Sequence, residues 1–232
     1  MQPSPTSYDL KIYDHLLQFV FFQGLSRGEL LQLAGNTKFL FSKIPAGRTL
    51  ASEGTPCHEL DFLISGSLEL TTRSADGGYS LSERLSAPWM IQPEALFGAT
   101  PRYTATWKTL TECQFITLHK DEVLRLLNEF LIIRLNLLNI LSTQAQKSTL
   151  QQWRRAPGSL AERFIRFLAA RAVYPAGYKE LRILMTRLAT ELGSSRLDVS
   201  HMLNSMQDNG MLTLHRGMIE IPSLERLIQH LC

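Results

Sequence analysis

The sequence is poor in cysteine and contains no long apolar run. Its 232 residues include three cysteines, Cys57, Cys113 and Cys232, which lie far apart. An odd and scattered set argues against a disulfide framework and against a clustered zinc or iron–sulfur site. No apolar run is long enough to span a bilayer, and the N-terminus lacks the basic-then-apolar pattern of a secretion signal. We therefore expect a cytoplasmic protein with reduced thiols and no membrane partner.

Sequence patterns of common enzymes are also missing. The chain has no phosphate-cradling glycine loop, no cluster of zinc ligands and no nucleophile elbow. Glu94 and His119 are single acid–base candidates without an apparent partner in the sequence. We expect a protein that is not an enzyme and that has no metal site.

Positive charge is concentrated in the C-terminal third of the chain. From residue 150 onward the sequence has eleven Lys and Arg against seven Asp and Glu, whereas the preceding part has thirteen against fourteen. The net charge of +3 therefore comes from the C-terminal part. An excess of this sign favours a polyanion as partner.

Residues 186–206 predict two short amphipathic helices separated by Gly193. Glycine can adopt the left-handed backbone that a sharp turn needs. Ser195 can cap the second helix, and Arg196 begins its polar face with a guanidinium that suits the O6/N7 edge of guanine. The apolar positions at helical spacing are Leu188, Ala189, Leu192, Val199, Met202, Leu203 and Met206. The pattern indicates a helix-turn-helix, although an ordinary helical hairpin would share it.

The segment after this pair of helices distinguishes the two alternatives. Residues 211–214 and 218–221 alternate around the turn His215-Arg216-Gly217, as in a β-hairpin. A hairpin directly after a recognition helix is a wing, and it places Arg216 at the tip, where phosphates would lie. The sequence therefore predicts a winged helix-turn-helix.

The N-terminal part changes from a helical to a β pattern. We expect helices over residues 8–22 and 26–35, followed by short β-rich segments with frequent turn residues between residues 38 and 118. This pattern predicts a small all-β barrel or sandwich, which could enclose one ligand or be filled by side chains. A short helix is expected over residues 121–127.

A long segment without proline or glycine, residues 129–153, predicts a helix between the two parts. Its possible heptad seam consists of Leu131, Leu135, Leu138, Ser142, Ala145 and Thr149. We expect this seam to pair with a second copy, the alternative being a core helix of a single subunit. Residues 154–159 break the helix and form the expected hinge, followed by a helix over residues 160–174 and a strand over 181–184.

This order of elements resembles the cAMP receptor protein/FNR family of bacterial transcription regulators. The motif P-A-G-R-T-L-A-S-E-G-T-P…L-D-F-L-I-S-G-S-L-E-L (residues 45–70) is similar to the family's β-roll, and L-A-T-E-L-G-S-S-R-L-D-V-S-H-M-L (residues 188–203) is similar to its DNA-binding motif. The resemblance implies an α+β fold with a cyclic-nucleotide-binding-like β-roll (a double-stranded jelly roll) over residues 1–127. A dimerisation helix over 128–155 and a winged helix-turn-helix over 156–232 would follow.

The resemblance also implies partners. A homodimer would bind double-stranded DNA at a near-palindromic site, with half-sites about one helical turn, roughly 34 Å, apart. RNA polymerase would be a further partner. The alternative function is a ligand-sensing or protein-interaction module with degenerate DNA binding. The sequence leaves open the target genes, the direction of regulation, the effector and the heptad register.

The family's DNA-reading positions carry over only in part. Arg196 matches the guanine-reading arginine, Leu197 stands where many members have glutamate, and His201 stands where many have a second arginine. Leucine could contact a thymine methyl instead, although both departures would also suit degenerate binding. Leu184 occupies the usual capping position of the first helix, so we expect that helix to begin later. The predicted DNA-binding residues are Ser195, Arg196, Leu197, Ser200, His201 and Arg216.

The effector segments depart further from the family pattern. Where the resemblance implies Gly-Glu and Arg-Ser/Thr-Ala, this chain reads Q-P-E-A-L-F and R-Y-T-A. No glycine precedes Glu94, and Tyr103 stands directly before Thr104. Arg102 is one residue early, which on a strand turns it to the opposite face unless a bulge restores it. The pocket candidates are Glu94, Arg102, Tyr103 and Thr104, and we expect an effector other than cAMP, or none.

Two further cofactors of the family are not expected. An iron–sulfur cluster would need an N-terminal group of cysteines, which is missing. A haem would depend on His58, His119 or Cys57, and each of these suits an ordinary turn position, so we assign no haem ligand.

Overall fold

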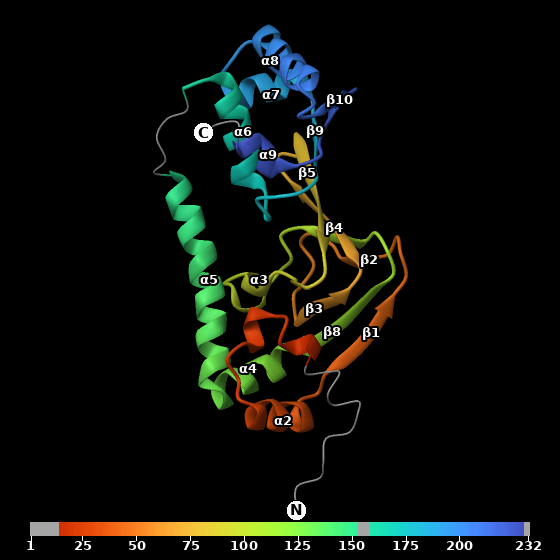
Figure 1. Ribbon diagram of the computed structural model, residues 1–232, viewed down its shortest axis with the longest axis vertical. Coiled ribbons are helices and arrows are strands. Elements are labelled where there is room, and N and C mark those ends of the chain that lie inside the picture. Colours follow the sequence, from red (N-terminus) through yellow and green to blue (C-terminus); the bar gives the residue numbers. More distant parts are fainter. Residues whose placement is uncertain (1–13, 153–157, 230–232) are drawn as a thin grey trace, which may run out of the picture. The chain divides into compact units, whose positions relative to one another are not determined.

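The computed structural model describes residues 14–152 and 158–229 (Figure 1). The chain forms two compact units. The first comprises Met1–Leu68, Ser86–Thr104 and Thr109–Lys147, and the second comprises Glu69–Leu85, Ala105–Lys108 and Ser148–Cys232. None of the described helices combines the length and apolar character needed to cross a membrane.

The first unit is built on an antiparallel sheet with the strand order β1-β8-β3-β6. These strands span Leu40–Ile44 (β1), Glu59–Ser65 (β3), Trp89–Met90 (β6) and Cys113–His119 (β8). The unit also contains η1 (Val20–Phe22), α2 (Arg27–Asn36), β2 (Thr49–Ala51), α3 (Pro93–Phe97), α4 (Lys120–Glu129) and most of α5 (Leu131–Gln152). The predicted β-roll with flanking helices is therefore confirmed.

One face of this sheet is covered by aromatic side chains from the N-terminal segment. The rings of Phe19, Phe21 and Phe22 lie 5.0, 5.7 and 5.2 Å from the ring of Phe62 on β3. The helix expected over residues 8–22 is wrong in its last part, because residues 14–16 are helical and a turn and the short 3-10 helix η1 follow. A regular helix presents only residues three or four apart on one face, so it could not bring all three rings onto Phe62.

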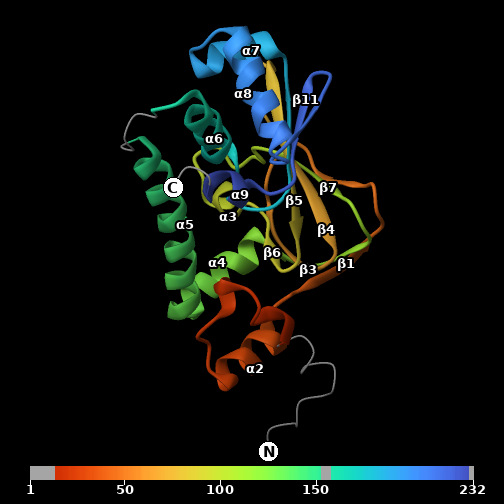
Figure 2. The same ribbon diagram turned by 45° about the horizontal axis from the view of Figure 1, so that its top comes forward.

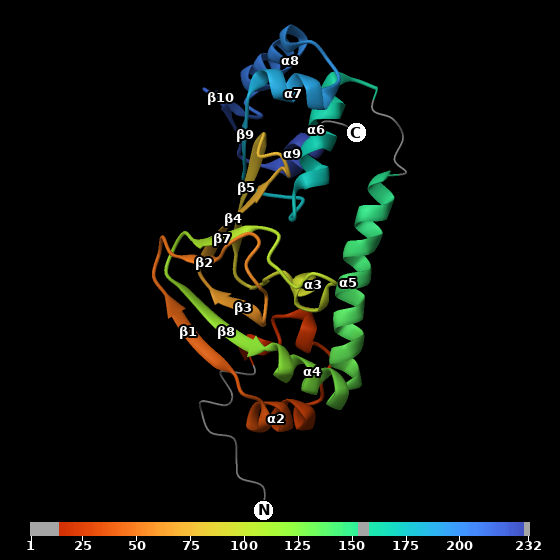
Figure 3. The same ribbon diagram turned by 180° about the vertical axis from the view of Figure 1, so that it is seen from behind.

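The helices expected over residues 121–127 and 129–153 are confirmed as α4 and α5. Phe130 has an extended backbone, ends α4 and is buried, and α5 begins at Leu131. In Figures 1 and 3, α5 runs along the first unit beside α3 and α4. Ile133 and Leu137 are buried there, whereas the predicted heptad residues are all exposed. They are Leu131, Leu135, Leu138, Ser142, Ala145 and Thr149. Residues 153–157, which include most of the expected hinge, lie outside the described residues.

The second unit contains the C-terminal helices and a larger antiparallel sheet. Its elements are β4 (Ser67–Arg73), β5 (Tyr79–Ser86), β7 (Thr106–Thr109), α6 (Leu160–Arg171), β9 (Lys179–Ile183), α7 (Met185–Leu192), α8 (Arg196–Asp208), β10 (Thr213–His215), β11 (Met218–Ile221) and α9 (Leu224–Gln229). The strands of this unit follow the order β10-β11-β9-β5-β4-β7. The β4–β5 hairpin thus extends the wing sheet, with residues from Tyr79 to Glu83 opposite those from Ile183 back to Lys179.

The two faces of this sheet differ. Leu81, Leu181 and Ile219 are buried against the helices α6, α7 and α8, which lie on one side of the sheet (Figures 1 and 2). Because side chains alternate along a strand, Ser80 and Arg182 lie on the other face. The hydrophobic core of this unit is therefore on the helix side, and the opposite face is free to carry polar groups.

A buried ion pair joins β5 to β9. Glu83 Oε2 lies 3.1 Å from Lys179 Nζ, and their side chains are 1% and 0% exposed. The Glu83 carboxylate also accepts hydrogen bonds from the backbone N–H groups of Val173 (2.7 Å) and Tyr174 (3.1 Å). Lys179 also donates to the carbonyl oxygen of Ala176 (2.7 Å). Both buried charges are thus paired and hydrogen-bonded, which is the condition for tolerating them in a protein interior.

Candidate DNA-binding surface and sensor cavity

The turn of the helix-turn-helix forms as the sequence predicts. Gly193 ends α7 with φ +57° and ψ +48°, the left-handed conformation. Ser195 then caps α8, because its side chain accepts from the backbone N–H of Asp198 (3.1 Å) and donates to the Asp198 carboxylate (2.7 Å). Arg163 on α6 donates to the carbonyl oxygens of Leu192 (2.6 Å) and Gly193 (3.0 Å). This third anchor of the turn comes from another helix, and the sequence analysis did not identify it.

Helix α8 separates buried and exposed residues as expected of a recognition helix. Val199, Leu203 and Met206 are buried on its inner face. Arg196 and His201 are exposed, Leu197 is 67% exposed, and Ser200 is half-buried. The exposed side chain of Leu197 is therefore accessible to another molecule.

The first helix of the pair begins earlier than expected. Helix α7 starts at Met185, and Leu184 is its N-cap residue although its side chain makes no capping hydrogen bond. The backbone N–H of Ile183, the last residue of β9, donates to the carbonyl oxygen of Gly217 in the wing turn (3.1 Å). This hydrogen bond fixes β9 as far as Ile183. The chain therefore passes directly from β9 through Leu184 into α7.

The wing presents a basic tip. Arg216 is exposed in the turn between β10 and β11, and Gly217 beside it has φ +73°. Gln207 near the end of α8 accepts a hydrogen bond from the backbone N–H of Leu214 in β10 (2.8 Å). This contact holds the wing beside α8 (Figure 2). Arg216 is therefore at the position that the sequence predicted for it.

The four effector candidates do not converge on one pocket. Glu94 is exposed on α3 and accepts from the side-chain amide of Gln144 (3.3 Å). Arg102 is exposed and donates to the carbonyl oxygen of Gly54 (2.6 Å), so no bulge returns it to the interior. Thr104 is exposed and is hydrogen-bonded to a neighbouring glutamine side chain. Tyr103 alone of the four is buried and lines the interior cavity.

That cavity lies within the first unit and has a volume of about 480 Å³. Its wall includes Asp61, Glu59, His58, Tyr103 and Thr117, and none of the described residues that line it is Lys or Arg. Of the two alternatives that the sequence left open, the cavity favours an interior with room for one ligand over an interior filled by side chains. The charge of its wall is the opposite of what a phosphate needs.

Asp61 is the distinctive residue of this cavity. Only 7% of it is exposed, and its carboxylate accepts a hydrogen bond from the Thr117 hydroxyl. Burial raises the pKa of Asp61 from 3.8 to about 6, so that it bears its charge only above that pH. Burial also raises the pKa of the Tyr103 phenol, which therefore stays a neutral hydrogen-bond donor at physiological pH. Asp61 was not predicted as a site residue, although a carboxylate on the inward face of the β-rich segment E-L-D-F-L-I-S was a usable signal.

Comparison with known proteins agrees with this architecture. Residues 41–130 match the cyclic nucleotide-binding domain family, and residues 162–230 match the Crp-like helix-turn-helix domain family. A CRP-like cAMP-activated global transcriptional regulator of Mycobacterium tuberculosis (strain CDC 1551 / Oshkosh) is 23% identical over 189 residues, covering 79% of this chain and 84% of that protein.

Solved structures show the same fold. The Thermus thermophilus catabolite activator protein has a TM-score of 0.50 at 18% identity, covering 92% of this chain and 100% of that one. The sensor domain of the transcriptional regulator DNR from Pseudomonas aeruginosa has a TM-score of 0.53 at 21% identity, covering 66% of this chain and 100% of that one. With both domain families matched in this order, the chain belongs to the cAMP receptor protein/FNR family of transcription regulators with a DNA-binding helix-turn-helix.

Proposed function

We propose that the protein binds a near-palindromic DNA site as a homodimer and reads it with the exposed face of α8. The observation that carries this proposal is the outward position of Arg196, directly after the Ser195 cap. The Arg196 guanidinium donates to O6 and N7 of a guanine, and Leu197 contacts a thymine methyl. Ser200 and His201 lie one turn further along the helix and complete the base-reading or backbone contacts.

Phosphate contacts orient the helix on the duplex. Arg216 at the wing tip is exposed and supplies a positive charge beside the groove that α8 enters. RNA polymerase is the protein partner that such a regulator would meet at its promoter.

Helix α5 supports the dimer. Its residues Leu131, Leu135 and Leu138 are 63%, 50% and 54% exposed, whereas Ile133 and Leu137 are buried in their own unit. One side of α5 thus presents an exposed row of leucines, while its other side packs against the first unit. A second copy of α5 would remove that row from water, as in a two-stranded coiled coil.

Hydroxyl-radical footprinting on the DNA upstream of the protein's own gene tests this function. Because a two-fold dimer places its recognition helices in successive major grooves, we expect two protected blocks about one helical turn, roughly 34 Å, apart. Protection spread evenly over any sequence, or none at all, would contradict the proposal and favour a sensing module with degenerate DNA binding.

The dimer is tested with Leu135→Glu. A charge in the leucine row is expected to yield a monomer in size-exclusion chromatography with light scattering, and to remove the paired footprint. Leu124→Glu is the control, because Leu124 is 42% exposed but belongs to a different helix, α4, and this variant should remain a dimer. A Leu135→Glu protein that is still dimeric would show that α5 is not the interface.

We further propose that the effector of the β-roll cavity is not cAMP. The phosphate of a cyclic nucleotide needs a fixed positive group, and the cavity offers the Asp61 carboxylate while Arg102 is held at Gly54. The fitting ligand is neutral or cationic and donates a hydrogen bond to Asp61. Adding millimolar cAMP is therefore expected to leave the thermal unfolding midpoint unchanged. A raised midpoint that disappears in Tyr103→Ala would show that cAMP occupies this cavity.

A further inference from the structure

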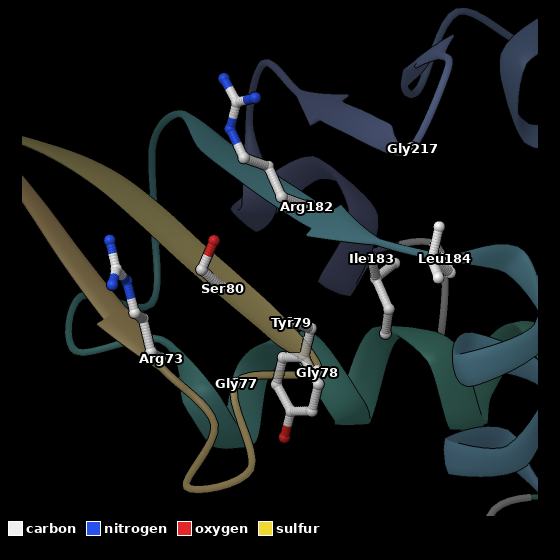
Figure 4. A pocket seen from close by; sticks show the side chains of 9 residues that line it. All are labelled: Arg73, Gly77, Gly78, Tyr79, Ser80, Arg182, Ile183, Leu184 and Gly217. Atoms are coloured by element: carbon white, nitrogen blue, oxygen red, sulfur yellow. The ribbon is translucent and has the colours of Figure 1, made fainter.

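The second unit contains a pocket of about 420 Å³ beside the wing turn (Figure 4). Arg73 on β4, Ser80 on β5 and Arg182 on β9 contribute polar side chains to its wall. Leu184, directly before α7, and Gly217 of the wing turn also line it. Three strands and the two ends of the DNA-binding motif thus meet at one pocket.

The polar side chains of the pocket point to one side of the sheet. Ser80 is paired with Arg182 across β5 and β9, and Tyr79 is paired with Ile183. Figure 4 shows Arg73, Ser80 and Arg182 projecting from one face, while Tyr79 and Ile183 project from the other, toward the helix beneath. The two guanidinium groups and the hydroxyl therefore share the face that the helices do not cover.

One of the two guanidinium groups of this pocket is paired with a neighbouring carboxylate. Arg73 is exposed, and Arg182, whose side chain is 63% exposed, makes an ion pair with Glu180 (2.7 Å). The pair uses Nε of Arg182, so the other donors of this guanidinium remain for a ligand. Asp76 in the nearby β4–β5 turn is engaged by Arg187 on α7 (2.7 Å). Two guanidinium forks beside a hydroxyl are the chemistry that recognises a phosphate group.

The location indicates the source of that phosphate. Gly217 adjoins Arg216 at the wing tip, and Leu184 precedes the first helix of the motif, the helix that crosses the DNA backbone in this class of protein. We propose that Arg73, Ser80 and Arg182 form an accessory site for a DNA backbone phosphate. The β4–β5 hairpin would then contact DNA together with the wing. This inference rests on the proposed DNA-binding function.

The test measures binding of the full-length protein to a duplex of arbitrary sequence by fluorescence anisotropy at several salt concentrations. Arg73→Ala and Arg182→Ala are each expected to weaken binding about threefold to tenfold, equally for all sequences, and to reduce the slope of log affinity against log salt by about one. Since both side chains are exposed, the thermal midpoint of each variant should match that of the wild type.

Arg84→Ala is the matched control. It removes the same charge from the same face of β5, four residues or about 13 Å along the strand from Ser80, where the guanidinium stacks on the Tyr178 ring at 4.0 Å. This variant should keep the wild-type salt slope. A slope lowered equally in Arg84→Ala would show a general effect of net charge and overturn the site.

The remaining outcomes separate this site from the function on which it rests. Both pocket variants could keep the wild-type affinity and salt slope while a third variant, Arg196→Ala, loses sequence preference. This result would overturn the phosphate site and leave the regulator function standing. A wild-type protein that binds no duplex would overturn the function itself. A last outcome concerns free phosphate compounds. If inorganic pyrophosphate raises the thermal midpoint of the wild type but not of Arg73→Ala or Arg182→Ala, while these variants bind duplex as tightly as the wild type, the pocket binds a free phosphate compound and the DNA assignment is wrong.

Discussion

Replacing Lys179 with methionine is expected to lower the free energy of unfolding by about 3–5 kcal/mol. The Glu83 side chain is only 1% exposed, and the substitution removes the positive partner of its carboxylate. The two backbone N–H groups that donate to Glu83 remain, but they do not replace a full charge in a poorly polarisable interior. Urea denaturation followed by circular dichroism, at neutral pH, measures the loss.

Two controls separate the effect of burial from that of a lost lysine. The double variant Glu83→Leu with Lys179→Met is expected to regain part of the lost stability, because no unpaired charge remains in the interior. The gain is partial because the backbone N–H groups of Val173 and Tyr174 lose their acceptor. Lys43→Met removes an ion pair with Glu112 whose side chains are 61% and 58% exposed, and it should cost less than about 1 kcal/mol. A Lys179→Met protein as stable as Lys43→Met would show that the buried pair does not hold β5 to β9.

The helix-turn-helix was predictable because its determinants are local. Gly193 supplies the turn and Ser195 supplies the cap, and both act within four residues of their position. The same holds for the wing. Its tight turn needs a residue with a positive φ, and Gly217 adopts this conformation without strain. Patterns of this kind need no knowledge of distant contacts.

The pairing of β5 with β9 was not predictable, since it joins segments about a hundred residues apart in the sequence. One signal was present. In the segment Y-S-L-S-E-R-L-S, alternation places Glu83 on the same face as Leu81 and Leu85, where a lone carboxylate needs a buried partner. Lys179 occupies the equivalent position on β9, on the face of Leu181. Two opposite charges on two apolar faces are a pattern that predicts pairing.

The effector segments show where carry-over from a family fails. The one-residue shift correctly predicted that Arg102 faces outward. The cavity wall, however, depends on strands that come together from across the unit, so Asp61 and Thr117 could not be identified from the family motif. The prediction for Leu184 was wrong for a different reason. Its side chain makes no capping hydrogen bond, as expected, but α7 begins directly after the end of β9 and not later.

Arg196→Ala tests the central claim most directly. The measurement is the ratio of dissociation constants for the footprinted site and a scrambled duplex, determined by anisotropy at one fixed salt concentration. Loss of a bidentate guanine contact should cost about 1–3 kcal/mol of specific binding, roughly fivefold to 150-fold in that ratio. Arg226→Ala on α9, an exposed position in the same unit, should leave the ratio unchanged. A ratio equally unchanged in Arg196→Ala would contradict the claim that α8 reads DNA through this residue.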